Sequence, residues 1–290
     1  MGGRAVMTTD GESDFDPWPA DVAEHVEWGI PGALFAARRG DLVLIVDVLS
    51  FSTAVTEVIA RGSVAFCYSP EALDAAGGRT AVAHRHDVAM LARRRNVGPG
   101  EFSLSPASLD AVPRGQRLAM TSLNGGRCVG AAADAPWVAT GCLANRSAVA
   151  PRITTFPADG HAARCTIVPY GETCAGPFMA EQVGELPAAN RGFVRPSIED
   201  HLGAGAVVDA LSTDVRRSVE AEAAAAVFER HRDRLESTLA GGASGCELVH
   251  RGFGDDVSIA ARLDAHRVVA QRSVDDPRNS SRVIGVSGHA

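Results

Sequence analysis

Short apolar runs alternate along the chain with segments of helical spacing. The strongest run, Leu42–Val46, is five consecutive apolar residues rich in β-branched types, which predicts a strand buried on both faces. Residues 54–60 after it have helical spacing, and Gly62 is the predicted C-terminal cap. The same reasoning predicts four further strands, at residues 63–68, 117–122, 137–140 and 165–169.

Helical segments follow and separate these strands. Short helices are predicted over residues 71–76, 108–111, 127–133 and 146–150. Longer helical stretches are predicted over 197–211 and 215–239, and a helix pair over 246–252 and 255–263. Residues 268–269 are expected to close the pattern as a last strand. The alternation of strands and helices indicates an α/β fold.

The domain organisation follows from the same pattern. We expect a single domain over residues 21–272, and a division into two lobes near 151–165 is left open. The polar, acidic segment 1–20 and the polar segment 273–290 are predicted to be flexible. No period of 20 to 50 residues repeats along the chain.

Composition excludes several classes of protein. The 290 residues are 46% hydrophobic with a net charge of -7, which is ordinary for a soluble protein and unsuited to binding nucleic acid through a basic patch. No segment reaches the roughly 18 apolar residues of a membrane span. The N-terminus has no apolar core of signal-peptide length. We therefore expect a cytoplasmic protein without nucleic-acid or membrane partners.

Lysine is absent and the cysteines are scattered, which narrows the chemistry further. All 28 fixed cations are arginines, so neither a Schiff-base lysine nor a GxxxxGK phosphate loop exists. None of the six cysteines forms CxxC, which argues against structural zinc. They are expected to be buried free thiols.

Polar, loop-forming residues follow at least three of the predicted strands, where ligands gather in open α/β sheets. The glycine amides at 125 and 126 open a predicted helix beside Arg127, an arrangement suited to an anion. Asp47, Glu199 and Asp200 offer hard oxygen ligands suited to Mg²⁺. A divalent ion beside an anion site suggests phosphoryl chemistry. The strand-end candidates are Asp47 with Ser52 and Thr53, Asn124 with Gly125 and Arg127, and Asn145.

Each of these features has a structural alternative. An aspartate after a strand is often a turn or cap residue, Asn-Gly is often only a turn, and Glu199-Asp200 opens a predicted helix that Ser197 is placed to cap. The sequence 84–87, His-Arg-His-Asp, resembles part of a metal motif, whereas arginines 93–95 are interpreted as a solvated face. No dinucleotide fingerprint and no GxSxG elbow is present.

Five segments, in order, match the motifs of one known family. Its "VIDVLRATTT" looks like residues 45–54, "TTNGTRA" is similar to 122–128, "N-A-x-A-V-A" to 145–150, "slEDxxcAGaiv" to 197–208 and "GFxxDV" to 252–257. Over roughly residues 43–269 the chain thus resembles the 2-phosphosulfolactate phosphatase family, Mg²⁺-dependent phosphatases of coenzyme M biosynthesis.

The resemblance implies a three-layer α/β/α fold with a mixed or mostly parallel sheet. It implies hydrolysis of a small anionic phosphate monoester, 2-phosphosulfolactate in the family. It also implies Mg²⁺, with catalytic and metal-binding acids at Asp47, Glu199 and Asp200. The residues expected to bind substrate are Ser52, Thr53, Arg85, Asn124, Gly125, Arg127 and Asn145.

The chain departs from the family pattern at several positions, including residues 103–106, to which the family's "GNSP" loop is reduced. Ser50 stands where the pattern has arginine, and His84, Leu123 and Gly126 replace a glutamate and two threonines. The alternative is therefore a catalytically impaired or repurposed member that binds small anions or regulates. A phosphatase with an aspartyl nucleophile ranks last, because its usual second acid would fall at Leu49. A homodimer is left open.

Overall fold

The computed structural model describes residues 22–155, 164–173, 194–211, 214–273 and 282–287. In these ranges ten strands form one mixed sheet, and a two-stranded sheet, β8 (Glu172–Thr173) with β9 (Val194–Arg195), lies apart. The order across the large sheet is β10 (Arg216–Arg217), β1 (Val22–Val26), β7 (Cys165–Pro169), β2 (Leu42–Val46), β6 (Trp137–Thr140), β11 (Val268–Arg272), β12 (Arg282–Ser287), β3 (Val64–Tyr68), β5 (Arg117–Thr121) and β4 (Ala89–Met90).

The sheet has two parallel sections, β10-β1-β7-β2-β6 and β3-β5-β4. Three antiparallel pairings, β6–β11, β11–β12 and β12–β3, separate them, so the two sections run in opposite directions. The carboxyl end of β2 in one section nevertheless lies close to the carboxyl end of β5 in the other. The evidence is a hydrogen bond of 3.0 Å from the N–H of Gly125, after β5, to the carboxylate of Asp47, after β2. This junction positions the functional site.

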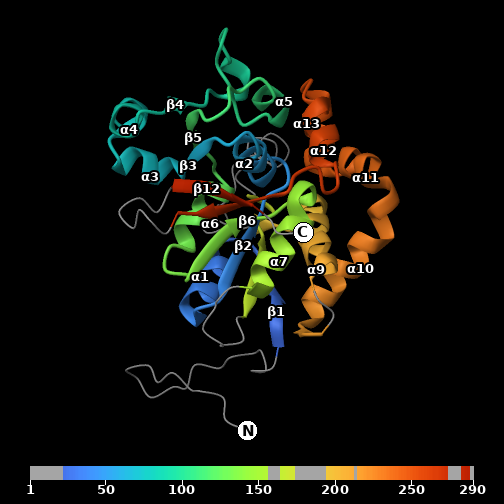
Figure 1. The fold of residues 1–290 in the computed structure, drawn as a ribbon. Helices are drawn as coiled ribbons and strands as arrows, with labels where there is room; N and C mark the ends of the chain where they lie inside the picture. The colour runs from blue at the N-terminus through green and yellow to red at the C-terminus, as the bar shows by residue number, and fades with distance from the viewer. Residues whose placement is uncertain (1–21, 156–163, 174–193, 212–213, 274–281, 288–290) are drawn as a thin grey trace, which may run out of the picture.

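Helices cover both faces of the sheet, which gives the three-layer α/β/α fold expected from the resemblance (Figure 1). β2 is fully buried, with Leu44 and Ile45 in the clusters on its opposite faces, because successive strand side chains point to opposite sides. One face packs on α1 (Gly29–Arg39), α2 (Phe51–Ala60), α5 (Pro106–Leu109) and α6 (Gly125–Ala131). The other packs on α7 (Arg146–Thr155), α9 (Ile198–Ala210), α10 (Val219–His231), α11 (Leu235–Gly241), α12 (Ala243–His250) and α13 (Gly254–Ala260).

A close approach of two helices, α9 and α10, depends on a glycine. A Cβ built on Gly205 of α9 would lie 2.0 Å from the carbonyl oxygen of Ala224 in α10. Only a residue without a side chain lets the two backbones approach this closely. A third, smaller cluster lies under α3 (Pro70–Ala75) and α4 (Gly78–His86), where Leu73 and Val82 pack beside β3.

Most predicted elements are confirmed, and most of their ends shift by no more than three residues. The helix predicted over 146–150 extends to Thr155, and the stretch predicted as helical over 215–239 contains β10, α10 and the first part of α11. The strands at 137–140 and 165–169 match β6 and β7, and Gly62 follows α2 at a φ of 70°, in the left-handed region. The elements β1, α1 and α4 are not among the predicted ones. No helix in the described ranges combines the length and apolarity needed to cross a membrane.

Two observations bear on the domain organisation. Residues 282–287, inside the predicted flexible tail, form β12, which pairs with both β11 and β3. Strands from both sides of residues 151–165 also interleave in the large sheet, since β7 lies between β1 and β2, so that stretch does not divide the fold into lobes. The predicted flexible segment 1–20 lies outside the described residues.

Candidate active site

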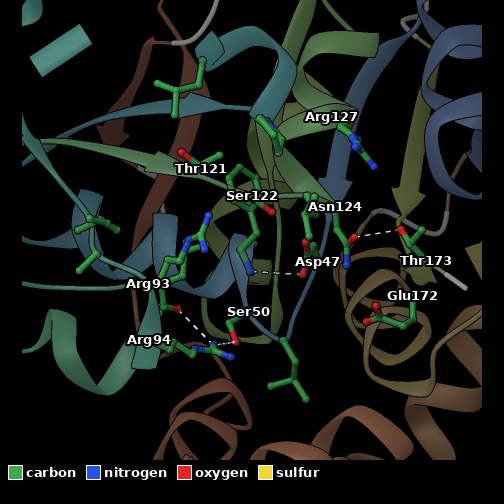
Figure 2. A pocket seen from close by; sticks show the side chains of 18 of the residues that line it. Asp47, Ser50, Arg93, Arg94, Thr121, Ser122, Asn124, Arg127, Glu172 and Thr173 are labelled. Atoms are coloured by element: carbon green, nitrogen blue, oxygen red, sulfur yellow. Dashed lines mark hydrogen bonds between the residues drawn. The ribbon is translucent and has the colours of Figure 1, made fainter. Parts of the chain in front are cut away.

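A cavity of about 1070 Å³ opens where the carboxyl ends of β2 and β5 meet. Three of the predicted site residues line it: Asp47, Asn124 and Arg127. Figure 2 shows Asp47 in the middle of the lining side chains, with Arg93 and Arg94 to one side and Glu172, Thr173 and Arg127 to the other. Further polar lining residues are Ser50, Asp74, Arg79, Thr121 and Ser122.

Asp47 is held by backbone groups from two parts of the chain. Its Oδ1 accepts the N–H of Phe51 at 3.3 Å, and its Oδ2 accepts the N–H of Gly125 at 3.0 Å. Burial raises its pKa from 3.8 to about 6, with a further upward contribution from Glu199, against the two N–H donors and Arg94. The Gly125 amide, predicted to bind phosphate, therefore binds this carboxylate instead.

Asp200 braces the two strand ends beside Asp47. Its Oδ1 accepts the N–H of Val48 at 2.7 Å after β2, and its Oδ2 accepts the N–H of Gly171 at 2.8 Å after β7. Burial, Asp47 and Glu199 raise the pKa of Asp200 well above its usual value. The side chain does not line the cavity.

Glu199 is the neighbour of Asp200 in the first turn of α9, and it is only 4% exposed. Its side chain makes no hydrogen bond or ion pair with the described residues. Its charge contributes to the raised pKa values of Asp47 and Asp200, which places it in the same electrostatic cluster. Ser197 occupies the N-cap position of α9, but its hydroxyl makes no capping hydrogen bond.

Sequence reasoning missed Glu172, which lines the cavity. Burial raises its pKa from 4.5 to about 7, and Asp47 and Glu199 add to this rise. It lies three residues beyond β7, the strand paired with β2. The strand-end reasoning that selected Asp47 applies equally to Glu172, so the signal was present in the sequence.

Four arginines line the cavity, and three were not predicted there. Arg79 donates to the carbonyl of Leu91 at 3.0 Å, and Arg127 pairs with Glu71 near the protein surface. Arg93 is exposed and makes no ion pair among the described residues. Arg94 is largely buried, so interpreting residues 93–95 as a solvated face was wrong for Arg94. A run of arginines carries no signal for which of them turns inward.

Five predicted substrate-binding residues do not line the cavity: Gly125, whose amide binds Asp47, and Ser52, Thr53, Asn145 and Arg85. Ser52 accepts from the Asp47 N–H at 3.0 Å and Thr53 donates to the carbonyl of Val48 at 2.8 Å, so both fix the turn after β2. Asn145 is fully buried and braces the turn after β6, where its Oδ1 accepts the Cys142 N–H at 2.9 Å. Arg85 is exposed on α4.

The carboxylates of the site are the kind of ligand that suits a magnesium ion, although they are not already arranged as a complete set of metal ligands. Carboxylate oxygens are its preferred ligands, and Asp47, Glu172 and Glu199 interact electrostatically in one region. The described residues contain no group of three ligand side chains already arranged around a metal ion. This applies also to the histidines of 84–87, of which His86 stacks on Phe66. Mg²⁺ commonly takes one or two carboxylates, with water and substrate phosphate as its other ligands, so the donor set fits.

Fold and site together define an α/β enzyme whose cavity is lined by carboxylates and by four arginines. The family model for 2-phosphosulpholactate phosphatase matches residues 30–273. The chain therefore belongs to the 2-phosphosulfolactate phosphatase family, whose members are phosphoric monoester hydrolases.

Curated relatives agree with this assignment. A probable 2-phosphosulfolactate phosphatase of Synechococcus sp. (strain RCC307) is 28% identical over 261 residues, covering 85% of this chain and 94% of the relative. The protein of the same description from Gloeobacter violaceus is 28% identical over 253 residues, covering 86% and 93%. A third, from Parasynechococcus marenigrum, is 25% identical over 249 residues, covering 83% and 92%.

Proposed function

We propose that the chain is a Mg²⁺-dependent phosphatase that hydrolyses a small phosphate monoester carrying additional negative charge, with 2-phosphosulfolactate as the leading substrate. The observation that carries this proposal is that four arginines line the same cavity as Asp47. Guanidinium groups bind phosphate and carboxylate through paired N–H donors, so several of them suit a substrate with several anionic groups.

The chain's own residues have distinct tasks in this proposal. Arg79, Arg93, Arg94 and Arg127 surround the entering anion, and Asn124 at the start of α6 adds an amide beside it. The Asn124 Oδ1 accepts a hydrogen bond from Thr173 at 3.2 Å, which leaves its amide N–H groups to face an acceptor. Asp200 keeps the ends of β2 and β7 in register.

Asp47 and Glu199 would hold Mg²⁺, with Glu172 as the third carboxylate nearby. When bound, the ion neutralises charge on the transferring phosphoryl group and orients the attacking water. A bound cation would stabilise the ionised carboxylates. Burial and mutual repulsion raise the pKa values of Asp47 and Glu172, and a positive charge beside them would oppose this rise.

The test is phosphate release with and without Mg²⁺ from 2-phosphosulfolactate, 2-phospholactate and p-nitrophenyl phosphate. We expect Mg²⁺-dependent release, in the order 2-phosphosulfolactate, 2-phospholactate, p-nitrophenyl phosphate, because the number of anionic groups falls along this series. Release without Mg²⁺, or a preference for the least charged ester, would contradict the proposal. Absence of release together with a phosphate-induced rise in melting temperature would support the alternative of an anion-binding protein.

A further inference from the structure

Arg94 is fixed in the cavity wall, and its polar contacts all use one nitrogen. Its Nη2 donates to the hydroxyl of Ser50 at 2.5 Å and to the carbonyl of Leu104 at 3.4 Å, and it lies 3.3 Å from Oδ2 of Asp256. The guanidinium also lies over the ring of Phe253, 5.5 Å from its centroid. Because Nη1 makes no hydrogen bond to the described residues, it is free to donate to a ligand.

Asp256 is fully buried and connects α13 to the segment around Arg94. Its Oδ1 accepts the hydroxyl of Ser105 at 2.5 Å and the N–H of Ala107 at 3.1 Å. Its Oδ2 has no hydrogen bond in the described part of the chain, and it faces Arg94. Oδ1 thus anchors the Asp256 carboxylate to residues 105–107, and Oδ2 is left to orient the guanidinium of Arg94.

Position 50 is where this chain lacks the arginine of the family pattern, and Arg94 brings a guanidinium to that position from 44 residues away. Its charge also acts on Asp47, because Arg94 lowers the pKa of Asp47 against the effect of burial. We propose that Arg94 binds an anionic group of the substrate beside Asp47, in the place of the missing arginine, and that Asp256 is its positioning residue. This inference rests on the proposed function for the identity of the substrate.

The physical reason for a positioning residue is the freedom of the arginine side chain. A guanidinium on a long stem loses rotamer entropy when it binds a ligand, and prior fixing by Asp256, Ser50 and Phe253 removes much of that cost. Asp256 does not line the cavity. Its effect on anion binding is therefore expected only through Arg94.

The experiment measures calorimetric binding of inorganic phosphate to the full chain in the presence of Mg²⁺. Arg94→Ser is expected to weaken binding by roughly tenfold or more, the usual size for a lost charge-assisted hydrogen bond. The exchange variant Ser50→Arg with Arg94→Ser, which returns the arginine to position 50, is expected to recover most of the affinity. Arg95→Ser is the matched control, because Arg95 is the next residue and does not line this cavity.

A double-mutant cycle tests Asp256. Asp256→Asn is expected to weaken phosphate binding in the natural chain but to have little effect in the Ser50→Arg, Arg94→Ser background, where no guanidinium at position 94 remains to be positioned. A purely structural role would weaken binding equally in both backgrounds and would overturn the assignment of Asp256.

Three other results would overturn the role of Arg94: no phosphate binding by the natural chain, unchanged binding by Arg94→Ser, or an equal loss in Arg95→Ser. If Arg94→Ser does not fold, Arg94→Lys replaces it. Lysine has a single side-chain nitrogen, so an ammonium held by Ser50 and Asp256 has no second nitrogen to donate to the ligand. Weaker binding is therefore still expected, and unchanged binding refutes the role. Because binding is measured without turnover, a natural chain that binds phosphate but hydrolyses nothing counts against the proposed phosphatase and not against Arg94.

Discussion

Replacing Asp47 by asparagine separates the role of its charge from the role of its shape. One pKa unit corresponds to about 1.4 kcal/mol. The rise of the Asp47 pKa from 3.8 to about 6 therefore means that the folded chain holds the ionised carboxylate at a cost of about 3 kcal/mol near neutral pH. A neutral asparagine removes this cost.

The same substitution leaves one backbone donor without an acceptor. Both carboxylate oxygens of Asp47 accept N–H groups, from Phe51 and Gly125, whereas asparagine has one oxygen and places an NH₂ group against the other donor. A buried unpaired N–H costs about 1–3 kcal/mol. The two effects oppose each other, so we expect the free energy of unfolding without Mg²⁺ to change by no more than about 2 kcal/mol.

Activity is expected to respond differently from stability. Loss of one preorganised charged group typically lowers turnover on the order of 100-fold or more, and we expect a loss of that size in Mg²⁺-dependent phosphate release by Asp47→Asn. The assay combines phosphate release with urea unfolding, and the matched control is Asp134→Asn, because Asp134 is exposed and does not line the cavity. A folded Asp47→Asn variant with unchanged release would refute the role of Asp47, and an equal loss in the control would show that the effect is not specific.

Two further predictions concern stability. Burial raises the pKa of Asp47 to about 6 and that of Glu172 to about 7, so the folded chain binds more protons than the unfolded chain between pH 4 and 7. The free energy of unfolding without Mg²⁺ should therefore fall as the pH rises over that window, by up to about 1.4 kcal/mol per pH unit for each group. Urea midpoints measured at pH 5, 6 and 7 test this, and a rise with pH would contradict it. Gly205→Ala should lower the free energy of unfolding by about 3 kcal/mol or more, because the new Cβ would lie 2.0 Å from the Ala224 carbonyl oxygen. A Cβ at Gly130 would have no atom within 4 Å, so Gly130→Ala should be neutral or stabilising by about 0.5–1 kcal/mol. Equal urea midpoints for these two variants would mean that α9 and α10 are not packed as described.

Sequence reasoning located the edge of the sheet that carries the site but assigned several residues the wrong task. Asp47 and Asn124 line the cavity because each follows a strand, which is a local property. Ser52 and Asn145 also follow strands, yet their side chains bond back to the nearby backbone and stabilise the turns. A strand-end position does not reveal whether a polar side chain points into a cavity or back to its own loop.

By itself the sequence determined the alternation of strands and helices, the central buried strand Leu42–Val46 and the family, because these depend on apolar spacing and on residues close together in the chain. Only the tertiary structure decided that Arg94 lies against Ser50, that Asp256 orients it, and that β12 joins the two sections of the sheet. Those contacts connect segments 44 residues or more apart or depend on strand order. The local pattern of residues predicts neither these long-range contacts nor the strand order, because packing across the whole domain determines which distant segments meet.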